Sequence, residues 1–287
     1  MSNRKPNHHE IPQFYLKGFS DSGTSYIWLF ERGRFFDPGK KRGKNNPALL
    51  GISQIGHRPD GYAICIPGKK TDYSYEAKLM KEEQKANLAL SKVRDQIEIT
   101  LADKQAIAEY ITLMAMRLTR RDQAAGPIVN PVVEDDQYDT LSRRLALGGR
   151  VDLALQVPKS KQFFYSNHGR TTLLRKSMFE RQWVTHTLSL MTWSFLVAPK
   201  GEFFVTSDNP TVYDESADLL RSPLLFPINH EVMLFGDWST NEDWSYKTIS
   251  ANKTRLLNTA VIRCATKEVY SPKSDRWIHD VMKSVPS

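Results

Sequence analysis

The order of its local patterns constrains the fold of this chain most. Short runs rich in aromatic and β-branched residues come first, as in Ser25–Glu31 (SYIWLFE) and Gly61–Gly68 (GYAICIPG). Long stretches with helical spacing follow, and short apolar runs bounded by Gly, Pro, Asn and Asp then return. Strands and helices in separate blocks favour an α+β fold over repeated βαβ units. We expect one domain over 1–287, with a β-rich part at 1–70, a mostly helical part at 72–193 and antiparallel strands at 194–271.

The helical block rests on apolar spacing. Between Tyr75 and Leu101 the apolar residues fall seven, four, three and four positions apart, which is one face of a helix: Leu79, Ala86, Leu90, Val93 and Ile97. Asp103 is the expected N-cap of the next helix. Further helices are expected near Pro131–Leu147 and at Thr171–Trp193. The segment RGRFF is expected to pair with the first strand, and the late strands are SFLVAP, EFFVTS, PLLFPI, EVMLFG and TAVIRCA.

Bulk composition is that of a globular protein, with 40% hydrophobic and 25% charged residues. No apolar run approaches the length that spans a bilayer, and MSNRKPNHHE lacks the apolar core of a secretory signal. Cys65 and Cys264 lie far apart in strand-like runs and form no zinc pattern, so we expect two buried thiols. These features predict a cytoplasmic protein without a membrane partner.

Basic charge is concentrated near the N-terminus. The chain has a net charge of +8, and residues 1–70 hold 12 Lys or Arg against 5 Asp or Glu. Arg32–Lys44 (RGRFFDPGKKRGK) has six basic residues, among them Lys40, Lys41 and Arg42, and one acidic residue. Such a segment beside two phenylalanines can contact a phosphate backbone. The alternative is a solvated hairpin tip whose lysines keep it soluble.

Charged residues interrupt both helical stripes. Glu76 and Glu83 fall on the core-facing line of the first helix, where a carboxylate must be paired, hydrogen-bonded or beside a cavity. Alternatively, the stripe ends near solvent. Arg117, followed by Arg120 and Arg121, lies beside the apolar face of the second helix and presents a fork that suits carboxylate or phosphate. An Arg117–Glu83 ion pair joining two helices is the structural alternative.

Two other groups of polar residues are candidates. His8 and His9 cannot both face one site from a regular strand, and their spacing is poor for a metal, so one of them would handle a proton or contact phosphate. Ser207, Asp208 and Asn209 end a strand just before a proline, where turn residues bond their own backbone. Strand ends are also where many sites are built. A lone histidine on an apolar stripe, His186, is expected to be a core residue.

Several segments together resemble a known family. HHEIPQFYLKGFS, YEAKLMKEE, AEYITLMAMRLTRR, FFVTSDNPTV and LLNTAVIRCATKEVYS are similar, in this order, to motifs of the bacterial domain-of-unknown-function family numbered 4238. The resemblance covers most of the chain and implies no activity. It does imply that the motif residues converge in one polar cleft, with Phe14, Leu16 and Phe19 anchoring the N-terminal segment. The cleft would hold His8 or His9, Gln13, Tyr15, Glu83, Arg117, Asp208 and Asn209.

Two functions of different class follow. The first is a phosphodiesterase or nuclease of a bacterial toxin or defence type, in which His9, preferred over His8 because it shares a side with Ile11, acts as acid or base. Arg117 would stabilise developing charge, while Glu83 and Asp208 orient the base or hold a divalent ion such as magnesium. The second is a non-catalytic protein that binds nucleic acid or an acidic partner and has only a structural polar network. In the first of these functions, the substrate would be contacted by Gln13, Tyr15, Arg121, Ser207, Asn209, Lys40, Lys41 and Arg42.

Overall fold

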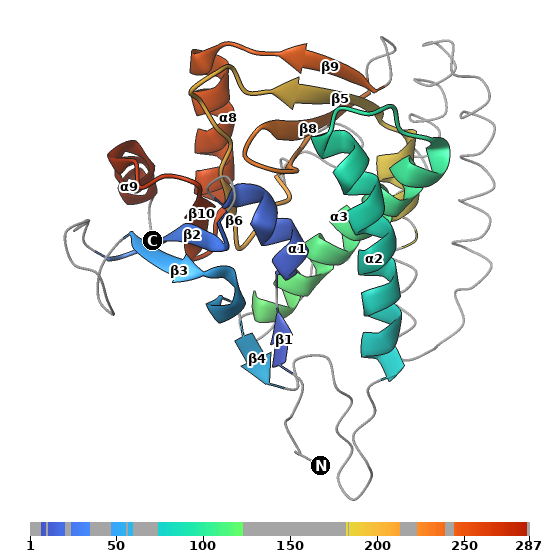
Figure 1. The fold of residues 1–287 in the computed structure, drawn as a ribbon, viewed down its shortest axis with the longest axis horizontal. Coiled ribbons are helices and arrows are strands. Elements are labelled where there is room, and N and C mark those ends of the chain that lie inside the picture. The colour runs from blue at the N-terminus through green and yellow to red at the C-terminus, as the bar shows by residue number, and fades with distance from the viewer. Residues whose placement is uncertain are drawn as a thin grey trace, which may run out of the picture.

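The computed structural model has helices on both sides of two β-sheets, and it confirms the α+β class (Figure 1). The structure describes residues 7–9, 11–20, 24–34, 47–55, 57–59, 74–122, 182, 184–212, 223–238 and 244–285, with the backbone alone at 7–9, 57–59, 74–78 and 116–122. The strand expected at Gly61–Gly68 and the helix expected near Pro131–Leu147 lie outside these ranges.

The first sheet joins the two ends of the chain. Its strand order is β3-β2-β10-β6, and all of its neighbours are antiparallel. The expected pairing of β2 with RGRFF is wrong, because β3 and β10 occupy the two sides of β2. The N-terminal and C-terminal β regions therefore share one sheet. The strands are β2 (Tyr26–Glu31), β3 (Ala48–Gly51), β6 (Thr206–Ser207) and β10 (Glu268–Ser271).

The second sheet has the order β7-β8-β5-β9. Its strands are β5 (Thr192–Val197), β7 (Leu224–Pro227), β8 (Val232–Asp237) and β9 (Ser245–Thr248). The expected antiparallel pairing holds for β7 with β8 and for β8 with β5, whereas β9 lies parallel to β5. A two-stranded ladder of β1 (Asn7–His9) and β4 (His57–Pro59) stands apart from both sheets.

Helices α2 (Ser74–Arg94) and α3 (Leu101–Asp122) form a hairpin. The apolar stripe is buried as expected from Leu79 to Val93, but the helix ends at Arg94 and leaves the Ile97 side chain 54% exposed. Thr100, not Asp103, caps α3. The Thr100 hydroxyl accepts the Asp103 N–H at 3.2 Å, and the Asp103 carboxylate accepts the Thr100 N–H at 2.8 Å.

The segment TAVIRCA is helical, so its expectation as a strand is wrong. It belongs to α8 (Ala251–Cys264), which buries Thr254, Asn258, Val261 and Ile262 at helical spacing. Its β-branched residues imitate a strand, but the Ser250 hydroxyl caps the helix by accepting the Lys253 N–H at 3.3 Å. Cys264 therefore ends a helix and is only partly buried. Residues 184–190 are helical too, but Trp193 lies in β5.

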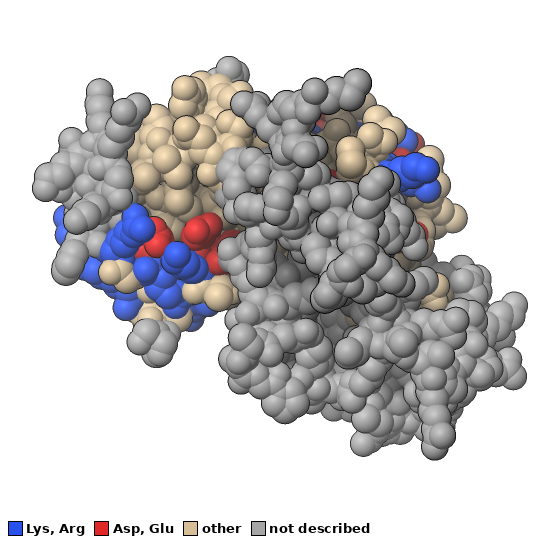
Figure 2. Space-filling model, turned by 90° about the horizontal axis from the view of Figure 1, so that it is seen from below, with Lys and Arg blue, Asp and Glu red and all other residues tan. Residues whose placement is uncertain are grey.

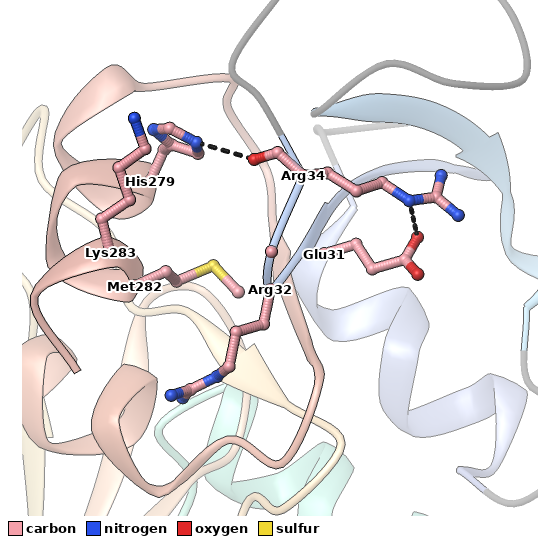
Figure 3. A pocket seen from close by; sticks show the side chains of 7 residues that line it. Glu31, Arg32, Arg34, His279, Met282 and Lys283 are labelled. Carbon is pink, nitrogen blue, oxygen red and sulfur yellow. Dashed lines mark hydrogen bonds and ion pairs between the residues drawn. The ribbon is translucent and has the colours of Figure 1, made fainter. Parts of the chain in front are cut away.

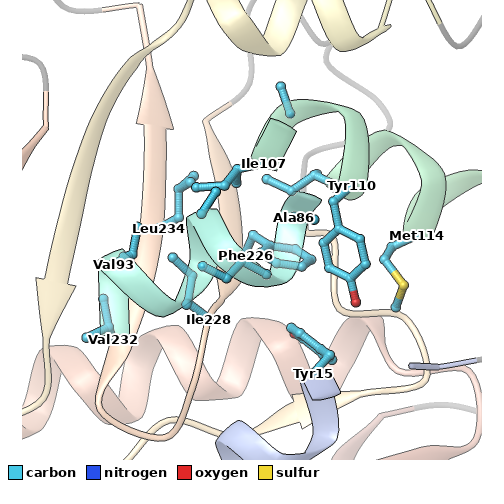
Figure 4. Packing of buried hydrophobic residues seen from close by; sticks show 14 of the residues in the cluster. Tyr15, Ala86, Val93, Ile107, Tyr110, Met114, Phe226, Ile228, Val232 and Leu234 are labelled. Carbon is cyan, nitrogen blue, oxygen red and sulfur yellow. The ribbon is translucent and has the colours of Figure 1, made fainter. Parts of the chain in front are cut away.

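Two apolar cores lie on opposite faces of the sheets. Neighbouring strand residues alternate between them: Ile27, Phe195 and Leu234 pack with α2 and α3, whereas Phe30, Leu196 and Met233 pack with α8. Figure 4 shows the first core, with Tyr15 reaching it from below. The remaining elements are α1 (Gln13–Leu16), η1 (Lys17–Phe19), η2 (Ile52–Gln54) and α9 (Arg276–Ser284).

Candidate functional site

Tyr15 ties the N-terminal segment to the centre of the fold. Its side chain is completely buried, and its hydroxyl donates to the Pro227 carbonyl at 2.7 Å. The Thr206 hydroxyl lies 2.9 Å away and donates in turn, since the single tyrosine proton is already used. Burial raises the pKa of the Tyr15 hydroxyl far above its ordinary value. The Tyr15 hydroxyl, which was expected to contact substrate, is therefore hydrogen-bonded to Pro227 and Thr206 within the protein.

The turn after α1 reaches the turn between β7 and β8. The backbone N–H of His230 donates to the Gly18 carbonyl at 2.8 Å. A Cβ on Gly18 would lie 3.0 Å from the Asn229 Cβ, so this close approach requires glycine. Leu16 and Phe19 are fully buried and Phe14 packs against the same core, which confirms the expected anchor. Residues 11–20 therefore pack against the core of the same chain, and we call them the docking element.

Arg94 is a polar residue that the helical pattern did not single out. Its Nη2 donates to the Phe14 carbonyl at 3.5 Å, and its buried Nε has no partner among the described residues. Burial lowers the pKa of the guanidinium, while the nearby Tyr110 and Tyr15 oppose this shift. Arg94 is the last residue of α2, and the apolar spacing of that helix does not predict which polar groups lie near its end. Arg94 is thus a buried cation beside the anchored N-terminal segment.

The Ser207–Asn209 turn holds the loop that follows α8. The Asp208 carboxylate accepts the backbone N–H groups of Thr266 and Lys267, each at 2.9 Å. The Asn209 amide donates to the Cys264 carbonyl at 3.1 Å, at the end of the helix. Ser207 alone bonds within its own turn, to the backbone of Asn209. Burial raises the pKa of Asp208, and the two backbone N–H groups oppose this shift.

The expected polar cleft is described only in part. Tyr15 contacts Thr206, so the N-terminal motif and the Ser207–Asn209 turn do come together. Glu83 and Gln13 are partly buried on α2 and α1. The side chains of His8, His9, Arg117 and Arg121, and the residues Lys40, Lys41 and Arg42, lie outside what the structure describes.

The backbone does place the two histidines. In the β1–β4 ladder His9 lies opposite His57, and His8 lies opposite Arg58. The expected divalent ion has no counterpart in the described part of the chain, where no three His, Cys, Asp or Glu residues are grouped to hold a metal. No site for magnesium is therefore assigned.

A cavity of about 110 Å³ lies between the end of β2 and α9 (Figure 3). Three basic side chains and one histidine line it, together with one acidic residue. The lining residues are Glu31, Arg32, Gly33, Arg34, His279, Met282 and Lys283. This is room for several water molecules, or for an ionic group of similar size.

Backbone carbonyls hold two of the cationic or titratable groups in place. Arg32 Nη2 donates to the carbonyls of Ala265 at 2.8 Å and Ile262 at 3.3 Å, at the end of α8. Its buried Nε has no partner among the described residues. The buried His279 donates from Nε2 to the Arg34 carbonyl at 3.0 Å. Arg32 and His279 are thus held in place at the cavity.

Glu31 reduces the positive charge here but does not cancel it. Its carboxylate lies 2.7 Å from Arg34 Nε and 3.1 Å from Lys267 Nζ. Residues 31–34 and 263–283 together hold seven Lys or Arg and four Asp or Glu, a net charge of +3. We call this region the β2–α9 basic surface. Figure 2 shows Lys and Arg gathered, with a few acidic groups, on the side where Figure 1 places β2 and α9.

Sequence reasoning identified only half of this surface. The run of basic residues from Arg32 onward indicated it, but Lys283 and His279 come from α9 at the other end of the chain. The sequence indicates α9 only through the helical spacing of the apolar residues Ile278, Val281 and Met282 around His279. Nothing in that spacing says which strand the helix covers.

Comparison with known proteins gives one match. No curated protein and no solved structure matches the chain. Within the described ranges, no helix is both long enough and apolar enough to cross a membrane. The model of the family described as "Protein of unknown function (DUF4238)" matches residues 7–275, which is nearly the whole chain. The resemblance seen in the motifs is thereby confirmed, and the chain belongs to this family.

Proposed function

We propose that this protein binds the phosphate backbone of a nucleic acid in the cytoplasm through its β2–α9 basic surface. The observation that carries the proposal is the cavity lined by Arg32, Arg34 and Lys283. The basic run that contains Lys40, Lys41 and Arg42 follows a few residues after this cavity in the sequence. Clustered Lys and Arg side chains attract phosphates and release their counterions.

The geometry of the cavity supports a phosphate as its ligand. Arg32 keeps its charge beside the cavity while its Nη2 donates to two carbonyls at the end of α8, and a fixed positive charge attracts phosphate. Lys283 supplies a compact second charge from α9, on the far side of the cavity (Figure 3). The basic side chains around the cavity therefore come from two separate parts of the fold.

The contacts of Asp208 favour binding without hydrolysis. One lone pair on each carboxylate oxygen of Asp208 accepts a backbone N–H group at 2.9 Å, so the carboxylate serves to hold the loop after α8. The Ser207–Asn209 turn is then part of a structural network. Gln13 and Tyr15 belong to the docking element rather than to a substrate cleft.

Hydrolysis of a phosphodiester is the second candidate function, and the β1–β4 ladder favours it. His9 and His57 lie opposite each other there, and opposite residues in an antiparallel ladder have Cα atoms about 4.5–5.5 Å apart. Two histidines at such a distance can serve as an acid and a base. Arg117 and Glu83 would assist as charge stabiliser and orienting carboxylate. Toxin or defence roles would follow from such an activity.

Fluorescence anisotropy with labelled DNA and RNA over a series of salt concentrations tests binding. The double variant Arg34→Gln/Lys283→Gln should bind more weakly, and the slope of log K against log salt should fall by about one for each lost phosphate contact. The matched control is Lys81→Gln/Lys85→Gln, which removes two exposed charges from α2 and should leave the slope unchanged. Absence of binding at low salt would refute the proposal.

The same preparations test hydrolysis. RNA, single-stranded DNA and duplex DNA are incubated with the protein, with and without magnesium or manganese, beside His9→Ala and Arg117→Ala. An acid or base, or a charge-stabilising group, should be worth at least about a hundredfold in rate. If the wild-type protein cuts no substrate faster than the His9→Ala/Arg117→Ala double variant, the second candidate fails and binding stands alone.

A further inference from the structure

An exposed apolar face lies on the same strand that leads to the cavity. Tyr26 is 55% exposed and Leu49 is 49% exposed, while Trp28 is partly buried between them and the second core. Tyr26 and Trp28 are two residues apart on β2 and so share a face, and Leu49 on β3 is the register partner of Trp28. We call Tyr26, Trp28 and Leu49 the aromatic face.

The aromatic face lies at the edge of its sheet in the described part of the chain. β3 is the last strand of its sheet and pairs only with β2 there. Large aromatic side chains on a protein surface are usually either buried or part of a binding site. Two such rings beside an exposed leucine form an apolar patch. The position of the patch in the fold points to what it binds.

Strand β2 connects the aromatic face with the basic cavity. Trp28 and Arg32 lie about 13 Å apart along the chain, at about 3.3 Å per residue, and the fully buried Phe30 lies between them on the same face. A short oligonucleotide can span this distance. Beyond Glu31 the chain presents Arg32 and Arg34, and Lys267 joins Glu31 from the neighbouring loop. Exposed apolar side chains are thus followed, beyond the end of the same strand, by basic side chains.

We infer that the aromatic face stacks unpaired bases, so that this protein selects single-stranded over double-stranded nucleic acid. This inference rests on the proposed binding of phosphate by the β2–α9 basic surface. Every base has a π-face on which Tyr26 and Trp28 can stack, whereas a duplex keeps these faces covered. The adjoining positive charge makes the backbone of a strand, rather than an apolar peptide, the matching occupant.

Three oligonucleotides of equal length separate the contribution of the bases from that of the phosphates. They are a single strand, an abasic strand with the same backbone, and a duplex, each labelled for anisotropy at one salt concentration. The wild-type protein should bind the single strand at least about fivefold more tightly than the abasic strand, the lower end of what one stacked base contributes. It should also prefer the single strand to the duplex.

Tyr26 is the residue to change because its exposed ring contributes little to the core. Tyr26→Ala should weaken binding of the single strand by about fivefold or more and leave the abasic strand unaffected. Tyr26→Phe keeps the ring and should keep the preference. Arg34→Gln/Lys283→Gln should weaken binding of all three oligonucleotides, because phosphates are common to them.

The possible results lead to different conclusions. Equal affinity for the single and abasic strands, or no effect of Tyr26→Ala, would overturn base stacking and leave phosphate binding intact. Failure of all three to bind at low salt would overturn the proposed function itself. Sedimentation velocity provides a further check: if Tyr26→Ala converts a dimer into a monomer, the aromatic face belongs to a second copy of the chain and the inference is wrong.

Discussion

Replacing Tyr15 with phenylalanine should destabilise the protein although it removes a single oxygen atom. The change deletes the 2.7 Å bond to the Pro227 carbonyl and the 2.9 Å contact with the Thr206 hydroxyl. Both of these groups are buried, so no solvent replaces the lost partner. The ring remains, and with it the contacts to Phe19 and Phe226 at centroid distances of 5.3 and 5.4 Å.

The expected magnitude comes from the groups left behind. A buried polar group that loses its partner costs about 1–3 kcal/mol, and we expect about 2 kcal/mol for Tyr15→Phe. Urea unfolding should show a lower midpoint with an unchanged m value. Tyr26→Phe is the matched control and should lie within about 0.5 kcal/mol of the wild type, because its ring is exposed.

A double-mutant cycle with Thr206→Val tests the assignment of this free energy. If the two hydroxyls interact, Tyr15→Phe should cost less in the Thr206→Val background than in the wild type. A cost below about 0.5 kcal/mol for Tyr15→Phe, or strict additivity with Thr206→Val, would refute the reasoning that this hydroxyl pair ties the N-terminal segment to β6.

Three further changes test other parts of the fold. Gly18→Ala should cost about 1–3 kcal/mol in urea unfolding, because the added methyl group meets the turn between β7 and β8. Asp103→Ala should cost about 1 kcal/mol at pH 7, because the Asp103 carboxylate no longer accepts from the N-cap Thr100 and from Lys92. Burial opposes the hydrogen bonds from Lys92 and Thr100 that hold the pKa of Asp103 below its ordinary value, so the difference should vanish as the pH falls through that lowered pKa. Burial lowers the pKa of His186, so the folded state binds fewer protons than the unfolded chain. Wild-type stability should therefore fall between about pH 7 and pH 5, and His186→Leu should remove that dependence.

Helical spacing predicted the central hairpin because it records burial directly. The stripe from Leu79 to Val93 faces the core as its period requires. The end of the helix was missed because the register continues through Ile97, while the backbone turns after Arg94 and places Gln96 at a positive φ of 54°. Periodicity thus identifies the buried face of a helix more reliably than its last residue.

Pairing between strands could not be read from the sequence. β2 takes its partners from residues 48–51 and 268–271, and the second of these lies more than two hundred residues away. Local patterns carry no information on contacts at such separations. The helix α8 was mistaken for a strand because Thr259, Val261 and Ile262 are β-branched, and tertiary burial of one helical face outweighs that preference.

The polar residues Asp208 and Asn209 stood out in the sequence, but their hydrogen-bond partners could not be predicted. Asp208 and Asn209 each break an apolar pattern, as buried polar groups do when they have specific hydrogen bonds. Which backbone they bind depends on where α8 ends, and α8 itself was not expected. Lys283 and His279 were missed for the same reason, since their importance comes only from the packing of α9 on the end of β2.

The Ser207–Asn209 turn and the basic cavity are parts of one structure. Asp208 and Asn209 hold residues 264–267 from one side, and Arg32 binds the carbonyls of Ile262 and Ala265 from the other. The Arg32 N–H also donates to the Lys267 carbonyl at 2.8 Å. The Ser207–Asn209 turn therefore fixes the loop after α8, and this loop in turn orients Arg32. Asp208 thus positions the loop that positions Arg32, although Asp208 itself does not line the cavity.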